Sequence, residues 1–386
     1  MLFPRTKCFL TFELCMVFII IEDDKTVKEA ALIDPLSYLI VGSGYRSRFF
    51  GRIARSHPDL FSAMYLCRSE EKAAGLTAST GIPATTREEE CLAFHPDFVI
   101  IAVDRGHNAS VTKTWIEKGF PVMLETPPGE NEEQLLELWQ LYKNGAKITV
   151  SEQYHRYPWM IRGFQAVADG VIGTPSSAYL SLAHDYHGSS LIRRMLLTSG
   201  ESYVMRGIKL QTPIVPTDSR YGAIFQAEPV QEERDIVGIQ FSSGKYAVYD
   251  FSGTQYRTFL RSRHLMVRGD RGEWSDSIIY RLDEDGVPTR DFLMPYIPEK
   301  YRCLDTQELR DLRKAWRPEI DMDQVQDEFA IASMLLDMRE YIAGGPSPYS
   351  FIEALDDAMF WLDLQKAAAA GEEAVSSAQM PWHSLV

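Results

Sequence analysis

The sequence has 386 residues, with 40 Lys and Arg against 54 Asp and Glu, so its formal net charge is −14. A chain of this length exceeds what one hydrophobic core usually serves, so we expect two domains. A hydrophobic content of 45% is typical of globular proteins and excludes wholesale disorder. The acidic surplus argues against nucleic-acid partners and anionic membranes, which require a basic contact face.

The cysteines and the N-terminal segment exclude further classes. Five cysteines without a C-x-x-C pair predict neither a disulfide framework nor a metal site. The apolar stretch at 8–21 contains Glu13 and is shorter than the ~20 residues of a membrane span. We therefore expect residues 1–36 to be an N-terminal extension, either an extra strand or an appended tail, and not an export signal. The expected location is cytoplasmic, with no membrane partner.

Short apolar runs alternate with amphipathic helices between residues 37 and 150. The pattern predicts strands at 38–41, 61–66, 98–103 and 121–124, and helices at 46–56, 70–76, 110–118 and 131–144. Such alternation is typical of a parallel sheet with helices on both faces. The N-terminal part is therefore predicted to be an α/β Rossmann domain with a doubly wound parallel sheet, which binds a dinucleotide.

A different pattern begins at residue 151. After a helix at 158–171, the sequence predicts strands at 178–182, 236–241, 246–251, 259–267 and 277–282, and then helices at 322–343 and 350–370. Glycines between the central runs indicate antiparallel hairpins. Residues 151–386 are thus predicted to form an α+β domain with a large, mostly antiparallel sheet and C-terminal helices.

A G-x-G sequence stands between the first predicted strand and helix. There a pyrophosphate can approach bare backbone and the positive N-terminus of a helix, although Ser47 replaces the third glycine of the usual G-x-G-x-x-G. The alternative is a tight turn without a ligand. The loop residues predicted to bind the cofactor are Gly42, Ser43, Gly44, Tyr45 and Arg46.

Arg68 and Ser69 follow the second predicted strand, where a carboxylate normally binds the adenosine ribose. A guanidinium pairs with a 2′-phosphate, so these residues favour NADP over NAD, which is the alternative cofactor. Arg68 could instead be a solvated residue at a helix start. The interval from Gly42 to Arg68 carries five arginines against Asp59 alone, which indicates a local positive patch.

Five segments occur in an order that resembles the Gfo/Idh/MocA oxidoreductases, named for glucose-fructose oxidoreductase and inositol dehydrogenase. They are YLIVGSGYRSR (38–48), FVIIAV (98–103), VMLETPP (122–128), SEQYHRYP (151–158) and GVIGTP (170–175). The resemblance extends over about residues 38–371. It implies a Rossmann domain, an α+β domain whose sheet often forms the oligomer interface, and redox chemistry on sugars, cyclitols or their derivatives with a nicotinamide cofactor.

Two departures from this family concern its catalytic groups. The resemblance implies Glu-Lys-Pro where this chain has Glu125-Thr126-Pro127, and a threonine carries no charge to stabilise a developing alkoxide. The family's Asp-x-x-x-His element corresponds to residues 183–194, which contain Asp and His at another spacing. Candidates for handling the hydroxyl proton are therefore Thr126, His184, Tyr186, His187 and Lys209.

The region around residues 184–187 leaves alternatives open. Histidine exchanges protons near neutral pH, which favours His184 or His187 as the acid/base, with Asp185 as a substrate-binding residue. Strand-like alternation would place His184 and Tyr186 on one face and Asp185 and His187 on the other. A structural role in the core is the alternative for each histidine.

Other candidates lie on the loops that follow predicted strands and in the arginine-rich segment 256–264. Arg156 is predicted to bind substrate or to brace the domain junction. Arg257, Arg261 and Arg263 share strand parity and suit an anionic substrate group, an intersubunit ion-pair network or an exposed charged face. Further residues predicted to contact the cofactor are Val103, His107, Asn108, Glu125 and Gln153.

These observations predict an NADP-preferring oxidoreductase that transfers a hydride to or from a sugar, cyclitol or related hydroxy or keto compound. The expected assembly is a homodimer or homotetramer through the C-terminal sheet. One alternative is a lyase or glycosidase, in which transient oxidation drives elimination without net redox. The other is a catalytically silent regulator that binds NAD(P), since Thr126 replaces the family's lysine.

Overall fold

The computed structural model describes residues 34–219, 222–314, 324–371 and 373–385. Of the N-terminal extension predicted for residues 1–36, residues 1–33 fall outside these ranges, and β1 begins at Leu36. The chain divides into two units, Met1–Asp34 and Pro35–Val386, and the elements below belong to the second. Within the described ranges, no helix combines the length and the apolar character that crossing a membrane requires.

The first sheet is parallel throughout and confirms the predicted Rossmann topology. The strand β4 (Phe98–Ile101) is fully buried because it is covered on both faces, as its continuous apolar sequence FVII requires. Across the sheet, the described strands run in the order β3 (Ala84–Thr85), β2 (Phe61–Leu66), β1 (Leu36–Val41), β4 (Phe98–Ile101), β5 (Val122–Leu124) and β6 (Ile148–Val150).

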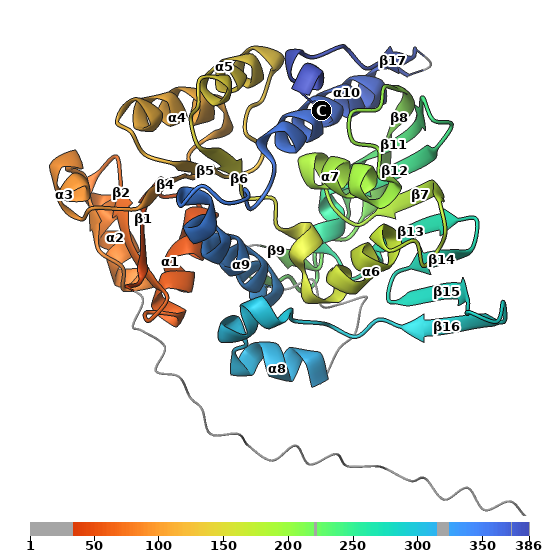
Figure 1. Ribbon diagram of the computed structural model, residues 1–386, viewed down its shortest axis with the longest axis horizontal. Coiled ribbons are helices and arrows are strands. Elements are labelled where there is room, and N and C mark those ends of the chain that lie inside the picture. Colours follow the sequence, from red (N-terminus) through yellow and green to blue (C-terminus); the bar gives the residue numbers. More distant parts are fainter. Residues whose placement is uncertain (1–33, 220–221, 315–323, 372, 386) are drawn as a thin grey trace, which may run out of the picture. The chain divides into compact units, whose positions relative to one another are not determined.

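Helices cover both faces of this sheet. In Figure 1, α4 and α5 lie on one face, and α1 lies on the other beside α9, a helix from the C-terminal part of the chain. The helices of this half are α1 (Ser47–Ser56), α2 (Glu70–Thr80), α3 (Glu88–Ala93), α4 (Asn108–Glu117) and α5 (Glu132–Lys143), with the 3-10 turn η1 (Arg105–His107). Because the strands are parallel, their carboxyl ends lie at the same edge of the sheet, where ligands of open α/β folds bind.

The second sheet is mixed, and all of its neighbouring strands are antiparallel except β7 and β12. This confirms the predicted α+β fold with a mostly antiparallel sheet. Its described strands run in the order β16 (Pro288–Phe292), β15 (Ile278–Leu282), β14 (Gly272–Ser275), β13 (His264–Gly269), β7 (Pro175–Ser181), β12 (Tyr246–Ser252), β11 (Val230–Phe241), β8 (Tyr203–Ile214) and β17 (Val375–Ser376).

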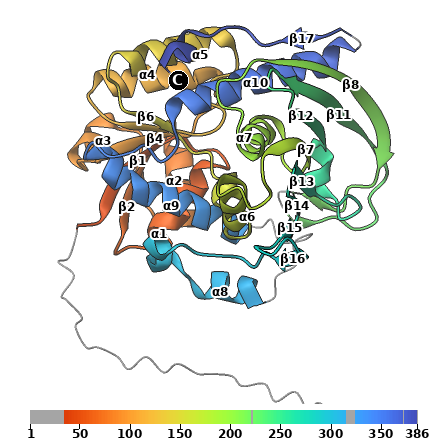
Figure 2. The same cartoon turned by 45° about the vertical axis from the view of Figure 1, so that its right-hand side comes forward.

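Helices pack on one face of the second sheet only. α7 contacts β7, α10 contacts β8 and β11, and no helix in the described ranges covers the opposite face (Figure 2). The helices are α6 (Pro158–Ala168), α7 (Asp185–Leu196), α8 (Gln307–Lys314), α9 (Gln324–Ile342) and α10 (Phe351–Ala370). The 3-10 turns are η2 (Tyr154–Arg156), η3 (Gly253–Arg257), η4 (Glu299–Leu304) and η5 (Pro381–Leu385), and β9 (Asp218–Ser219) pairs with β10 (Gly222–Ala223).

The structure corrects two predicted elements near the candidate site. The alternation assumed for residues 184–187 is wrong, because α7 begins at Asp185. Its sequence includes Gly188 and two serines, which are weak helix formers, but its buried apolar side chains stabilise it against β7 and α10. The strand predicted at 259–267 is also wrong over most of its length, because β13 begins only at His264.

Candidate active site

A cavity of about 1630 Å³ lies at the carboxyl edge of the parallel sheet. Its walls come from the loop at 42–46, the loops that follow β4 and β5, the start of α7, and the segment 256–263. Loops attached to both sheets therefore contribute to the cavity. These loops lie too far apart along the chain for one sequence motif to include them. The size suits a dinucleotide together with a small substrate.

The glycine loop between β1 and α1 presents its backbone to this cavity. Gly42 has a φ of +132°, and a side-chain Cβ there would lie 2.1 Å from the carbonyl oxygen of Ala102, so only glycine fits. A Cβ at Gly44 would meet nothing within 4 Å, which leaves that side of the loop open. The loop is thus closed against the sheet and open toward the cavity, a shape that fits a pyrophosphate at the start of α1.

Arg46 is held by carboxylates from distant parts of the chain. Its Nε lies 2.9 Å from Oε1 of Glu125, and its Nη1 lies 2.7 Å from Oδ2 of Asp327 on α9. Asp327 also accepts hydrogen bonds from Gln153 and from the hydroxyl of Tyr157. Burial alone would raise the pKa of Asp327, but the charge of Arg46 and these donors hold it below its ordinary value. The charge that Arg46 contributes to the predicted positive patch is therefore compensated within the protein.

Arg68 follows β2 at the rim of the cavity, as the sequence predicts. Arg68 and Lys72 are exposed, both line the cavity, and neither forms an ion pair in the described part of the chain. Ser69 does not line the cavity. Its side chain caps α2 by accepting a hydrogen bond from the backbone N–H of Lys72. Two cations thus stand together where an adenosine ribose is expected.

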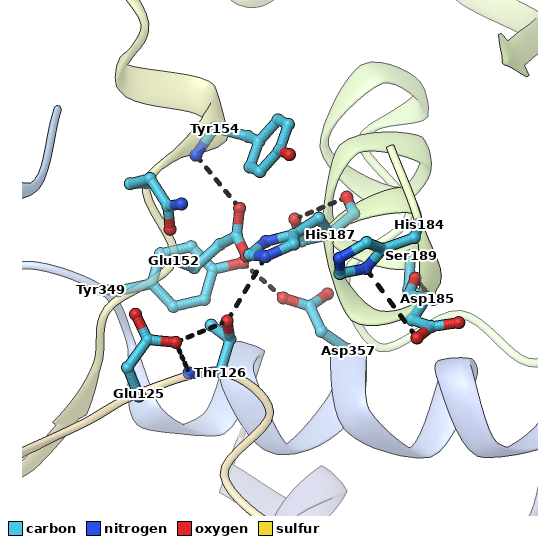
Figure 3. Close-up of polar contacts among 12 residues, drawn as sticks. Glu125, Thr126, Glu152, Tyr154, His184, Asp185, His187, Ser189, Tyr349 and Asp357 are labelled. Carbon is cyan, nitrogen blue, oxygen red and sulfur yellow. Dashed lines mark hydrogen bonds and ion pairs between the residues drawn. The ribbon is translucent and has the colours of Figure 1, made fainter. Parts of the chain in front are cut away.

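His187 and Thr126 are brought together in the cavity (Figure 3). The imidazole Nε2 lies 3.4 Å from Oγ1 of Thr126, and Nδ1 lies 2.6 Å from Oε2 of Glu152, a carboxylate with no exposed surface. The hydroxyl of Thr126 also lies 3.2 Å from Oε2 of Glu125, which accepts the Thr126 backbone N–H as well. The buried carboxylate orients the imidazole so that Nε2 faces Thr126.

The short contact between Glu152 and His187 selects one tautomer of the neutral ring. With Nδ1–H donated to Glu152, the neutral imidazole keeps its lone pair on Nε2. Thr126 has one hydroxyl proton and two neighbouring acceptors, His187 and Glu125, so it cannot satisfy both. Nε2 is therefore available to a hydroxyl group that enters the cavity.

His184 lies beside His187, with ring centroids 5.3 Å apart. Burial, followed by the charges of His187 and Arg105, lowers the pKa of His184 well below its ordinary value, so this ring stays neutral. Tyr186 is buried, and burial together with the charge of Asp357 raises the pKa of its phenol well above the usual value. Neither group therefore changes its charge near neutral pH.

Asp185 opens α7 and also lines the cavity. Burial raises the pKa of its carboxyl, which the charge of Arg105, 4.0 Å away, partly offsets. Its backbone N–H donates to the hydroxyl of Tyr249, and that of His184 donates to the hydroxyl of Tyr256. The helix start is thus anchored on two tyrosines of the second sheet and its following turn.

Besides Ser69, two predicted site residues do not line the cavity. Lys209 lies on β8 and pairs with Asp235 and Glu233, at 3.3 and 3.6 Å. Arg156, offered as a substrate-binding residue, instead lies 2.7 Å from Asp337 on α9 and donates to the carbonyl of Pro348. The structure thus favours a bracing role for Arg156, the other of its two predicted roles.

The remaining residues predicted to bind the cofactor line the cavity. Asn108 donates to the carbonyl of Pro127 but keeps a buried Oδ1 without a partner in the described structure, and the same holds for Oε1 of Gln153. Buried acceptors of this kind suit a ligand that carries N–H or O–H groups. The other predicted residues that line the cavity are Ser43, Tyr45, Val103 and His107.

Sequence reasoning missed Glu152 and Asp327, the two carboxylates that order the site. Glu152 stood within the quoted segment SEQYHRYP, directly after an apolar strand, and an acidic residue beside a fully buried strand was the available signal. Asp327 carried no local signal, because its partners lie far away in the sequence. Across the described ranges, no group of three or more His, Cys, Asp or Glu side chains is arranged to hold a metal ion.

Comparison with known proteins agrees with this architecture. Residues 36–154 match the family model GFO_IDH_MocA, described as "Oxidoreductase family, NAD-binding Rossmann fold". No curated protein sequence matches the chain significantly.

Solved structures share the fold over most of the chain. Levoglucosan dehydrogenase in complex with NADH has a TM-score of 0.67 at 15% identity, covering 90% of this chain and 100% of that one. An oxidoreductase from Agrobacterium radiobacter in complex with NAD+, L-tartaric acid and magnesium has a TM-score of 0.65 at 13% identity, with coverages of 88% and 98%. GenD2 from gentamicin A biosynthesis, in complex with NAD, has a TM-score of 0.61 at 16% identity, with coverages of 91% and 98%.

These structures match most of the chain, and at such identities they establish the fold alone. The sequence match covers the Rossmann part, including the glycine loop and the Glu-Thr-Pro segment. Residues 36–154 of the chain are thus similar to the NAD-binding Rossmann domain of the Gfo/Idh/MocA oxidoreductases.

Proposed function

We propose that the protein is an NAD(P)-dependent dehydrogenase or reductase acting on a carbon that bears a hydroxyl or keto group. The observation that carries this proposal is the imidazole of His187, which is fixed by buried Glu152 and lies in the same cavity as the glycine loop. A proton acceptor and a dinucleotide loop in one cavity are what oxidation of a hydroxyl requires. When bound, the nicotinamide supplies the hydride acceptor or donor.

In this proposal His187 exchanges the proton of the substrate hydroxyl. In the direction of oxidation, Nε2 accepts that proton, and Glu152 stabilises the imidazolium through Nδ1. In the direction of reduction, the same nitrogen returns the proton to the carbonyl oxygen. Glu152 contacts the imidazole and the backbone N–H of Tyr154 but does not line the cavity, so we assign it the part of a positioning residue.

Thr126 takes a different part from the family's lysine. Its hydroxyl can donate to the substrate oxygen when it turns away from Glu125, but it brings no positive charge. The guanidinium of Arg46, which contacts the neighbouring residue Glu125, is also bound to Asp327. We infer that stabilisation of negative charge on the substrate oxygen depends on proton transfer to His187 more strongly than it would beside a lysine.

The substrate class is proposed from the neighbours and from the cavity. Levoglucosan, an anhydrosugar, is bound in one neighbouring structure, and L-tartaric acid, a hydroxy acid, is bound in another. The wall of this cavity near His187 consists of polar groups and the rings of Tyr154, His184 and Tyr256. Such a wall suits a sugar, a cyclitol or a related polyhydroxy compound.

A panel of sugars, cyclitols and sugar acids tests the proposed reaction. The purified full-length chain is incubated with each compound and NAD or NADP, and the absorbance of the reduced cofactor is followed together with product analysis. Stoichiometric formation of reduced cofactor and keto product is the expected result. Product formed by elimination without accumulation of reduced cofactor would favour the lyase alternative, and cofactor binding without turnover of any compound would favour the regulator.

We propose NADP as the preferred cofactor because Arg68 and Lys72, at the rim beyond β2, form no ion pair with any described residue. Arg68→Ser removes the guanidinium expected at the 2′-phosphate. It should weaken NADP binding by about 10- to 100-fold and leave the Kd for NAD nearly unchanged. Calorimetric titration of both cofactors measures the two constants.

Arg48→Ser is the matched control. Arg48 lies on the exposed face of α1, belongs to the same arginine-rich interval, and does not line the cavity. It should leave both constants unchanged, since only non-specific charge is lost. An equal loss of NADP affinity in both variants, or none in Arg68→Ser, would contradict the preference.

The homo-oligomer expected through the second sheet stays a prediction. The face of the second sheet that no described helix covers exposes apolar side chains on β8, β11 and β12. An interface on this face would cover Ile208, Leu210, Val230 and Tyr246.

A further inference from the structure

One wall of the cavity carries arginines that the proposed proton transfer does not use. Arg257, Arg261 and Arg263 lie between β12 and β13, and all three line the cavity. The prediction that these arginines project from one strand face is wrong, because η3 and a loop replace the predicted strand here. Their position in the cavity follows from the path of this loop.

The three arginines differ in their partners. Nη2 of Arg261 lies 3.2 Å from Oε1 of Glu232, whose residue is only 1% exposed, so this charge is compensated. Arg257 and Arg263 are half-buried, and neither lies within ion-pair distance of a carboxylate in the described part of the chain. Two of the arginines that line the cavity therefore have no counter-ion among the described residues.

A series of aromatic rings connects Arg263 with His187. The guanidinium of Arg263 stacks 4.9 Å from the ring centroid of Tyr256. The Tyr256 hydroxyl lies 3.0 Å from that of Tyr154, and the Tyr154 ring lies 4.4 Å from the ring of His187. His184 closes the same wall, 5.2 Å from Tyr256. A small ligand on this wall can contact the cationic group and the proton acceptor at once.

The charges of the cavity favour an anion at this end. Asp185 pairs with Arg105 at 4.0 Å, and Asp218 lines the wall without forming an ion pair with Arg257 or Arg263. A half-buried guanidinium without a counter-ion is costly, and a bound anion removes that cost. The planar fork of a guanidinium matches a carboxylate in two hydrogen bonds, which makes this group the best partner.

We propose that the substrate is a polyhydroxy acid, whose carboxylate binds Arg257 and Arg263 while one of its hydroxyl groups reaches His187. This inference rests on the proposed function, since it adds an anionic group to the hydroxyl substrate. A neutral sugar would leave both guanidinium groups uncompensated. A phosphate ester presents similar charge with tetrahedral geometry, and the test below separates it from a carboxylate.

Binding to the full-length chain with oxidised cofactor tests the proposal without requiring turnover. The probes are four acids, each with its neutral counterpart: gluconate with glucitol, galactonate with galactitol, glucuronate with glucose, and galacturonate with galactose. Glucose 6-phosphate is the phosphate arm. By calorimetry, at least one acid should bind about 10- to 100-fold more tightly than its counterpart, and Arg263→Gln or Arg257→Gln should remove most of that difference.

Arg268→Gln is the matched control, because Arg268 lies on β13, pairs with Glu273 at 2.7 Å and does not line the cavity. It should keep the preference for acids, and melting temperatures verify that each variant is folded. The proposal is overturned if no acid binds more tightly than its counterpart, if the phosphate ester alone binds tightly, or if Arg263→Gln and Arg257→Gln both keep the preference. Tight binding without oxidation would count against the proposed reaction only, and oxidation of neutral sugars without any preference would count against the polyhydroxy acid only.

Discussion

Replacing His187 by Asn is expected to lower kcat for hydroxyl oxidation by about 10²- to 10⁴-fold, the range typical of a lost general base. The Asn amide can still donate to Glu152 near the position of Nδ1, but it has no titratable nitrogen in place of Nε2. The buried carboxylate therefore keeps a partner, and the loss falls on proton transfer. Steady-state kinetics with a substrate found in the panel measures this effect.

Two readouts separate proton transfer from a purely structural role of His187. The variant should lose kcat while its cofactor Kd and its melting temperature stay the same, because Asn keeps the contact with Glu152. His264→Asn is the control, since His264 is exposed on β13 and does not line the cavity. A His187→Asn enzyme with wild-type kcat would exclude His187 as the base.

Gly44→Asp is expected to weaken cofactor binding by about 100-fold or more while the protein stays folded. A side chain at this position meets no protein atom within 4 Å, so the apo protein can accept it. Its carboxylate would point from the open side of the loop toward the expected pyrophosphate, and like charges repel there. Calorimetric titration with NADP and NAD measures the loss, and melting temperatures establish that folding is intact.

Gly44→Asn is the matched control for size, because it has nearly the same shape without the charge. It should lose less affinity than Gly44→Asp, and the gap should shrink as salt is raised, since ions screen an exposed charge. Equal affinities for wild type and Gly44→Asp would show that the cofactor does not approach this loop. The prediction concerns the loop alone, so it stands apart from the roles of His187 and the arginines.

Much of the fold could be predicted because it is encoded locally. The run FVII at 98–101 has to be buried on both faces, and such runs between amphipathic helices specify a parallel sheet. β8 escaped prediction because its face without helices exposes side chains of mixed polarity, so it shows no continuous apolar run. α7 escaped because its first half is polar and rich in weak helix formers, and its stability depends on packing against β7 and α10.

In the candidate site, too, residues with a local sequence signal could be predicted, and residues whose role depends on distant contacts could not. The glycine loop and Arg68 could be placed from sequence, since each has a fixed position relative to a strand end. His187 could be named but not distinguished from His184, because the distinction depends on Glu152 reaching Nδ1 from another element. Lys209 was named for its chemistry alone, and the strand that carries it turns it toward Asp235 and Glu233.

The contact between Arg46 and Asp327 also bears on how the protein is made. The two residues are 281 positions apart, so most of the chain must leave the ribosome before Arg46 can meet its partner on α9. Until then the glycine loop lacks Asp327, the carboxylate that also accepts hydrogen bonds from Gln153 and Tyr157. The cofactor site is therefore completed late in biosynthesis, although its loop is among the first described parts of the chain to be synthesised.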